Sequence, residues 1–174
     1  DLLLRLSLPS SPTGGLLQAA YAGHVAIVNT LLEQKADVNA ANSDGVCALI
    51  AGAPEGHLGV VETLLKHKAE VNSSVNGIST LEACLAKELD PARRVDVVQC
   101  LLQHKAQIQT PQVWEACCEG ETDIVRAVLT HHPSWDVNSQ DERGITSLHI
   151  ASSDCHLPVV ELLVRAGANV NVAS

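Results

Sequence analysis

Cysteine and histidine are the residues of this sequence that could hold a metal ion or take part in catalysis. The 174 residues include six cysteines and eight histidines. However, no C-x-x-C pair occurs, and no two histidines have the three-to-five-residue separation of common zinc sites. The adjacent pair His131-His132 precedes Pro133, and a helix that ends at this proline explains the pair better than metal binding does. We therefore predict neither a metal site nor a cofactor.

Nucleophilic catalysis requires a base and an orienting group beside the nucleophile. Cys118 stands next to a carboxylate, Glu119, but has no histidine in register. The pair Gly14-Gly15 lacks the further glycine and the Lys-Ser/Thr of a phosphate-binding loop. The cysteines are irregularly spaced, and the adjacent pair Cys117-Cys118 is poorly placed for a disulfide. We expect a protein that is not an enzyme, with reduced thiols and a cytoplasmic location, the nucleus being an alternative.

The elements that position these residues are predicted by an internal repeat. Gly23-His24 recurs 33 residues later as Gly56-His57. A branched apolar pair occurs five times at uneven steps, as Ile27-Val28, Val60-Val61, Val97-Val98, Ile124-Val125 and Val159-Val160. After the second of these pairs, Leu64 and Leu65 continue the pattern at helical spacing, which gives the helix one apolar stripe. One helix pair cannot bury that stripe alone, whereas stacked pairs can.

The motifs of the repeat resemble those of the ankyrin repeat family. The family pattern has a D-x-x-G turn, a first helix that opens T-P-L-H-x-A, a G-H turn and a second helix with paired leucines, followed by G-A-x-V-N. The copy from Asp141 to Asn171 matches best, with Thr146-Ser147-Leu148-His149 at the start of its first helix. A second good copy runs from Asn42 to Asn72. The resemblance implies an all-α fold, an ankyrin-repeat solenoid of stacked antiparallel helix pairs with short hairpin or β-turn fingers.

The resemblance covers nearly all of the chain from Thr13 onward, and this suggests two segments. Residues 1–12 form an apolar N-terminal segment, which is either a cap or the remnant of a preceding element. Residues 13–174 form the ankyrin repeat domain. Its repeats are expected at about 13–40, 41–72, 73–109, 110–138 and 139–174.

Three departures from the family pattern make the repeats unequal. Lysine replaces the usual glycine at the end of three second helices, at Lys35, Lys68 and Lys105, and only Gly167 follows the family. Residues 87–94 replace the G-H turn of the third repeat with a longer, polar loop. Between the third and fourth repeats only residues 110–112 separate Gln109 from Val113, so one finger is absent.

The charge of the chain restricts the class of partner. There are 11 Lys and Arg residues against 20 Asp and Glu, a formal charge of -9, which repels nucleic acid and anionic membrane surfaces. The opening DLLLRLSL is too short to span a bilayer. The expected partner is another protein with a basic or neutral segment. The absence of an initiator Met suggests that the chain belongs to a larger multidomain protein.

Ankyrin family members contact their partners with the finger tips and the exposed face of the first helices, and the resemblance carries these roles to matching positions here. The finger positions are Ser43, Asp44, Asn76, Ile78, Glu142, Arg143 and Ile145. The helix-face positions are Tyr21, Glu55, Lys87, Cys118, Glu119, Ser153 and Asp154. Trp114 occupies the histidine position of T-P-L-H, and it either anchors a partner or fills the space of the missing finger.

These observations favour a protein–protein interaction module, a scaffold or adaptor that binds a partner segment along its concave face and finger tips. Two alternatives remain open. The chain could act as a stand-alone ankyrin-type inhibitor that clamps an enzyme, or as a structural spacer within a larger repeat array.

Overall fold

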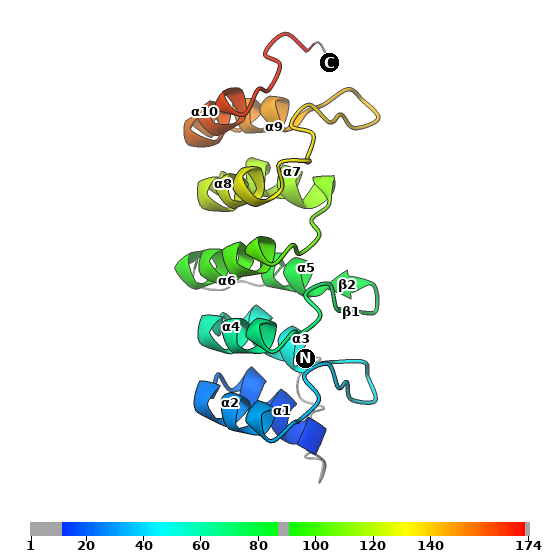
Figure 1. Ribbon diagram of the computed structural model, residues 1–174. Coiled ribbons are helices and arrows are strands. Elements are labelled where there is room, and N and C mark those ends of the chain that lie inside the picture. The colour runs from blue at the N-terminus through cyan, green and yellow to red at the C-terminus, as the bar shows by residue number, and fades with distance from the viewer. Residues whose placement is uncertain (1–11, 87–90, 173–174) are drawn as a thin grey trace. The chain divides into compact units, whose positions relative to one another are not determined.

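A computed structural model of the chain describes residues 12–86 and 91–172 (Figure 1). The chain divides into two compact units: unit 1 extends to Ala106, and unit 2 begins at Gln107. Both units consist mostly of short helices, which confirms the expected all-α repeat fold. The N-terminal segment 1–11 and residues 87–90 of the expected polar loop lie outside the described residues.

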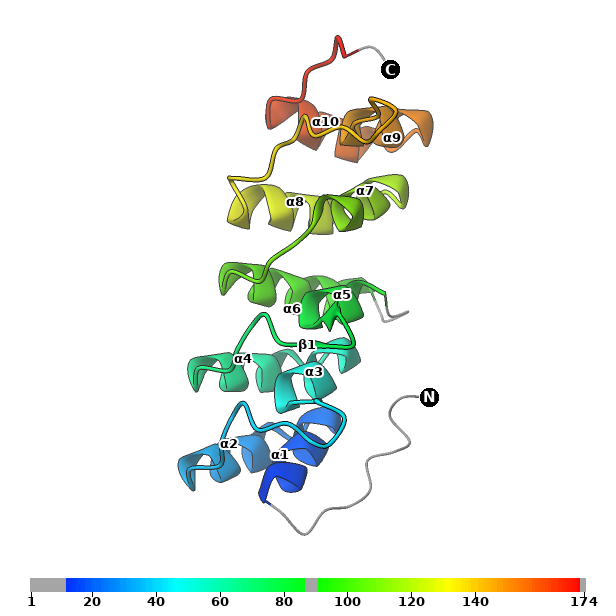
Figure 2. The same ribbon diagram turned by 90° about the vertical axis from the view of Figure 1, so that its right-hand side faces the viewer.

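The described part of unit 1 holds three successive helix pairs. The first helices are α1 (Pro12–Tyr21), α3 (Ala48–Gly52), which the 3₁₀ turn η2 (Ala53–Glu55) continues, and α5 (Thr80–Leu85). The second helices are α2 (Val25–Glu33), α4 (Leu58–Lys66) and α6 (Pro91–Gln103). First helices contact first helices, and α4 contacts both α2 and α6, so like elements lie side by side in both views (Figures 1 and 2).

Unit 2 has the same construction with two helix pairs in its described residues. These are α7 (Thr110–Cys118) with α8 (Thr122–His131), and α9 (Ser147–Ser153) with α10 (Leu157–Arg165). Here α7 contacts α9 and α8 contacts α10. Helix α8 ends at His131, two residues before Pro133, as the sequence predicts.

The core of unit 1 is formed by the recurring apolar residues of the second helices. In α4, the side chains of Val60, Val61 and Leu64 are fully buried, and Leu65 is nearly so. Small residues of the first helices allow neighbouring repeats to approach closely. A Cβ on Gly52 would lie 2.9 Å from the carbonyl oxygen of Ala20 in the preceding repeat, so no larger residue fits there without a shift.

The finger loops of the second and fifth repeats are closed by a side chain at their first position. Asn42 Oδ1 accepts hydrogen bonds from the N–H groups of Asp44 and Val46, at 3.0 and 2.9 Å. In the fifth repeat, Asp141 Oδ1 accepts from Arg143 and Ile145, both at 2.8 Å. Each loop is thus a rigid turn built around one carboxylate or amide oxygen.

The third finger is a β-hairpin. Strand β1 (Ser74–Val75) pairs antiparallel with β2 (Ile78–Ser79). Asn76 and Gly77, which connect them, both have positive φ, at 53° and 82°. This Asn-Gly turn is the one that a two-residue hairpin favours, because its twist matches that of the strands.

The three lysines at the ends of second helices have left-handed backbone conformations. Their φ angles are 66°, 67° and 66° for Lys35, Lys68 and Lys105. The N–H of Lys68 donates to the carbonyl of Leu65, and the next N–H, of Ala69, donates to Leu64. This pair of hydrogen bonds forms the usual glycine-type helix end with a lysine in the strained position.

Replacing Lys68 with glycine is therefore expected to stabilise unit 1 by about 0.5–1 kcal/mol, because glycine adopts this conformation without the Cβ clash. The reverse change, Gly167→Lys, should destabilise unit 2 by a similar amount, since Gly167 has φ 94° and open space around its Cα. Urea titration of both variants gives the free energies of unfolding. Equal stability of Lys68→Gly and the parent chain would contradict the prediction.

Candidate functional site

The ends of α7 and α9 bring together exposed residues of two adjacent repeats. Cys118 is the last residue of α7, and Asp154 follows the last residue of α9. The thiol of Cys118 forms a hydrogen bond with the carboxylate of Asp154. Glu119 and Ser153 are also exposed beside them. The sequence indicated that all four occupy equivalent positions of the repeat, and the structure adds the direct contact between two of them.

This surface of unit 2 carries a negative potential that acts on the thiol. The hydrogen bond to Asp154 raises the pKa of Cys118 above its ordinary value, and the negative charge of Asp154 acts in the same direction. The charges of Glu119 and Glu115 also raise this pKa. We name the exposed cluster of Glu115, Cys118, Glu119 and Asp154 the acidic face.

Cys118 is thus expected to react slowly with an alkylating agent although it is exposed, because only the thiolate is nucleophilic. The change Asp154→Asn should lower the pKa of Cys118 and increase its alkylation rate severalfold at pH 8. Mass spectrometry after timed treatment with iodoacetamide measures this rate for each cysteine. Glu142→Gln, which removes an exposed carboxylate from the finger of the same unit, is the control and should leave the rate unchanged. An unchanged rate in Asp154→Asn would contradict the prediction.

Two histidines at the turns between helices connect adjacent repeats. The Nε2–H of His57 donates to the carbonyl oxygen of Tyr21 in the preceding repeat, at 3.0 Å. In unit 2, the Nε2–H of His156 donates in the same way to Cys118, at 2.7 Å. The ring of His57 lies against Gly23, where a Cβ would come within 2.7 Å of the ring. These histidines have a structural role that the repeat itself explains.

Trp114 is half-buried near the beginning of α7. Its indole Nε1 is buried and has no hydrogen-bond acceptor among the described residues. The ring follows an unusual helix start: the N–H of Gln109 donates to Gln112 Oε1 at 3.0 Å, and Pro111 occupies the first turn, where no donor is needed. A capped, longer helix thus stands where the other repeats have a finger, a feature that the sequence analysis missed although both glutamines were visible.

The finger positions differ in exposure. Five polar or charged tips and one apolar tip are exposed, namely Ser43, Asp44, Asn76, Glu142, Arg143 and Ile78. Ile78 is 52% exposed. Ile145 is half-buried, because its N–H is held by the carboxylate of Asp141.

The helix-face positions of unit 1 are less accessible than those of unit 2. Tyr21 and Glu55 are half-buried. Lys87 lies outside the described residues. The acidic face of unit 2 is therefore the part of the predicted site where exposed residues of two repeats lie together.

All six cysteines are free thiols. Four are buried, at Cys47, Cys84, Cys100 and Cys117, and two are exposed, at Cys118 and Cys155. The prediction that Cys84, Cys100 and Cys117 are buried small residues is confirmed. Within residues 12–86 and 91–172, no group of three or more His, Cys, Asp or Glu side chains is arranged to hold a metal ion.

Burial raises the pKa of the Cys117 thiol to about 11, so the folded state holds this proton more tightly than the unfolded state does. The resulting stabilisation is complete below about pH 8.5 and is lost as the pH rises toward 11. Unit 2 is expected to lose about 2 kcal/mol over this interval relative to Cys117→Ala. Urea titrations at several pH values, followed by tryptophan fluorescence, measure the difference. Parallel pH profiles of the two chains would contradict the prediction.

The fold and these surfaces define a repeat protein whose layers are helix pairs with projecting fingers. A model of the family described as Ankyrin repeats (3 copies) matches residues 11–75 and 92–174. The chain therefore belongs to the ankyrin repeat family, whose repeats are protein-interaction modules.

Curated relatives are similar to parts of the chain. An ankyrin repeat-containing protein of Schizosaccharomyces pombe is 38% identical over 64 residues, which are 36% of this chain and 30% of that protein. Alpha-latrocrustotoxin-Lt1a of Latrodectus tredecimguttatus is 38% identical over 61 residues, 35% of this chain and 4% of the toxin. RelA-associated inhibitor of Mus musculus is 39% identical over 57 residues, 33% of this chain and 7% of the inhibitor. The chain thus spans less than a third of the length of each relative.

The helices in the described part of the chain were also compared with the requirements of a membrane span. None of them is both long and apolar enough to cross a bilayer.

Proposed function

We propose that this chain is a scaffold or adaptor module that binds a segment of another protein with its first-helix face and finger tips. The observation that carries the proposal is the acidic face of unit 2. There, residues of two successive repeats are exposed together, and their carboxylates act on a common point, the thiol of Cys118. A partner segment that contains Lys or Arg is the natural complement, because opposite charge steers encounter and selects among partners.

Trp114 supports the same location. Its buried indole N–H has no acceptor among the described residues, and a buried donor without a partner costs about 1–3 kcal/mol. A carbonyl oxygen of a bound segment would satisfy this donor. The neighbouring finger supplies exposed Glu142 and Arg143 as further contacts.

The proposal is tested with synthetic peptides that contain Lys and Arg and with matched peptides in which Glu replaces the basic residues. The triple variant Glu115→Gln, Glu119→Gln, Asp154→Asn should bind the basic peptides at least about tenfold more weakly, a loss of about 1.4 kcal/mol. Isothermal titration at two salt concentrations measures affinity and charge dependence. The variant keeps the helix register, so circular dichroism should be unchanged.

The matched control removes three exposed carboxylates from second helices, by Glu33→Gln, Glu62→Gln and Glu161→Gln. This control has the same net charge as the acidic-face variant but leaves the first-helix face intact. Equal weakening by both variants would mean that total charge, and not the acidic face, determines binding. Binding of the Glu-containing peptides with equal affinity would contradict the choice of a basic partner.

An inhibitory role is the second candidate, because one relative is named RelA-associated inhibitor. In this alternative the chain would clamp an enzyme, and a spacer role within a larger array would require no partner at all. The proposal further includes a chain without catalytic activity of its own, a cytoplasmic or nuclear location consistent with six free thiols, and a place within a larger multidomain protein.

A further inference from the structure

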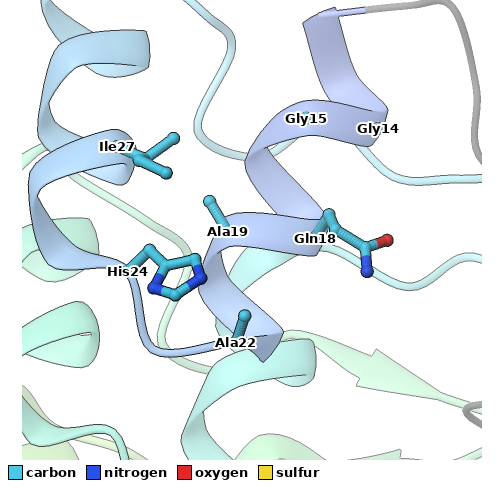
Figure 3. A pocket seen from close by; sticks show the side chains of 7 residues that line it. All are labelled: Gly14, Gly15, Gln18, Ala19, Ala22, His24 and Ile27. Atoms are coloured by element: carbon cyan, nitrogen blue, oxygen red, sulfur yellow. The ribbon is translucent and has the colours of Figure 1, made fainter.

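The N-terminal end of unit 1 presents an apolar surface. A hollow of about 350 Å³ lies between α1 and α2, and its lining includes Ala19, Ala22, His24 and Ile27 (Figure 3). Ile27 is 50% exposed and the nearby Val25 is 40% exposed. We name this surface the end face.

The next repeat indicates what the end face is built to do. Val60 of α4 corresponds to Ile27 of α2, but it is fully buried in unit 1, where α4 contacts α2. His57 corresponds to His24, and its ring donates a hydrogen bond to the carbonyl of Tyr21 in the repeat before it. Ile27 and His24 therefore occupy interface positions of the repeat, and within the described residues no layer precedes them.

A second copy of this chain does not fit the end face with its C-terminal repeat. The ring of His57 requires Gly23 beneath it, because a Cβ there would lie only 2.7 Å away. The corresponding turn position of the last repeat is Cys155, which has a left-handed φ of 60° and carries a Cβ. That Cβ would occupy the space that the ring of His24 needs.

We propose that segment 2–8 of this chain covers the end face. Five of its seven residues are leucine, at Leu2, Leu3, Leu4, Leu6 and Leu8. Residues 9–11 alone separate the segment from the start of α1, and the hollow is lined by Gly14 and Gly15 in the first turns of that helix. Three residues span up to about 10 Å, which suffices to turn back over the adjacent surface.

The chemistry of the segment matches the two interface positions. Its leucine side chains remove Ile27 from water, and a short segment outside the helix pairs has main-chain carbonyls available to accept a hydrogen bond from His24. The segment thereby takes the place of a preceding repeat layer and ends the stack, as a terminal layer must.

The test combines a deletion of residues 1–8 with the change Ile27→Ser in a double-mutant cycle. Circular dichroism follows thermal unfolding, and hydrogen exchange of the α2 amides assigns the effect to unit 1. In the full chain, Ile27→Ser should lower the melting temperature by about 3 °C, and in the truncated chain it should have almost no effect. The deletion itself should make the α2 amides exchange about tenfold faster.

Ile78→Ser is the matched control, because Ile78 is 52% exposed on the hairpin and is also an isoleucine. It should have the same small effect with and without residues 1–8. If the truncated chain does not fold, Leu4→Ser with Leu6→Ser in the full chain replaces the deletion. Equal effects of Ile27→Ser in both backgrounds would overturn the proposal. A concentration-dependent dimer in sedimentation that Ile27→Ser abolishes would overturn it in favour of a second copy.

Discussion

The change Gly120→Ala is expected to destabilise unit 2 by about 3 kcal/mol. An L-residue at the φ of 70° found here costs about 1–2 kcal/mol. In addition, the new Cβ would lie 2.4 Å from the ring of His156, which must move away. This movement breaks the 2.7 Å hydrogen bond from His156 to the carbonyl of Cys118, at a cost of about 1 kcal/mol. Urea unfolding followed by tryptophan fluorescence reports on unit 2, because Trp114 and Trp135 both lie there.

The control for this prediction is Gly167→Ala in the same unit. Gly167 also has a positive φ, of 94°, but nothing lies within 4 Å of an added Cβ. It should cost only the conformational part, about 1 kcal/mol. In the background His156→Ala, the cost of Gly120→Ala should fall to the same value, since the ring is absent. A cost for Gly120→Ala no greater than that for Gly167→Ala would contradict the steric explanation.

The change Leu64→Ala is expected to destabilise unit 1 by about 3 kcal/mol, within the 2–5 kcal/mol typical of buried leucines. The side chain of Leu64 is fully buried, in the helix that contacts both α2 and α6. Its removal leaves a cavity shared by neighbouring repeats, which cannot close without a shift of whole helices. Urea titration followed by circular dichroism measures the loss.

Leu157→Ala provides the comparison at the same residue type. Leu157 begins α10 and is 64% exposed. Its truncation should change the stability of unit 2 by less than about 0.5 kcal/mol. If both changes had similar costs, burial within the stack would not be the main source of stability. The pair thus tests whether the energy lies between the repeats, as the contacts indicate.

Much of the fold followed from short-range patterns. The recurring branched pair predicted the second helices, because helical spacing creates a single apolar stripe wherever it occurs. Pro133 predicted the end of α8. The D-x-x-G pattern predicted the turn at Asp141–Gly144, since an aspartate at that position can hold two backbone N–H groups by itself. These features depend on residues close in sequence, and the sequence alone is enough to find them.

The candidate site was less accessible to this reasoning. Repeat register placed Cys118 and Asp154 at related positions, but it could not predict the hydrogen bond between them, because the two residues come from different repeats. The helix start at Gln109 was also missed, since a glutamine pair is a rare cap and the family pattern predicts a finger there. The boundaries of the five repeats and the binding residues remain predictions.

The sequence by itself determined the class of fold, the acidic charge and the chemical character of each repeat position, because these depend on residue type and spacing. Only the tertiary structure decided which equivalent residues face a neighbour. Ile27 and Val60 occupy the same position of the repeat, yet one is half exposed and the other fully buried. Cys117 and Cys118 are adjacent, yet only Cys118 is exposed to meet a partner. The physical reason is that burial in a stack depends on the adjacent layers, which lie about one repeat away in sequence.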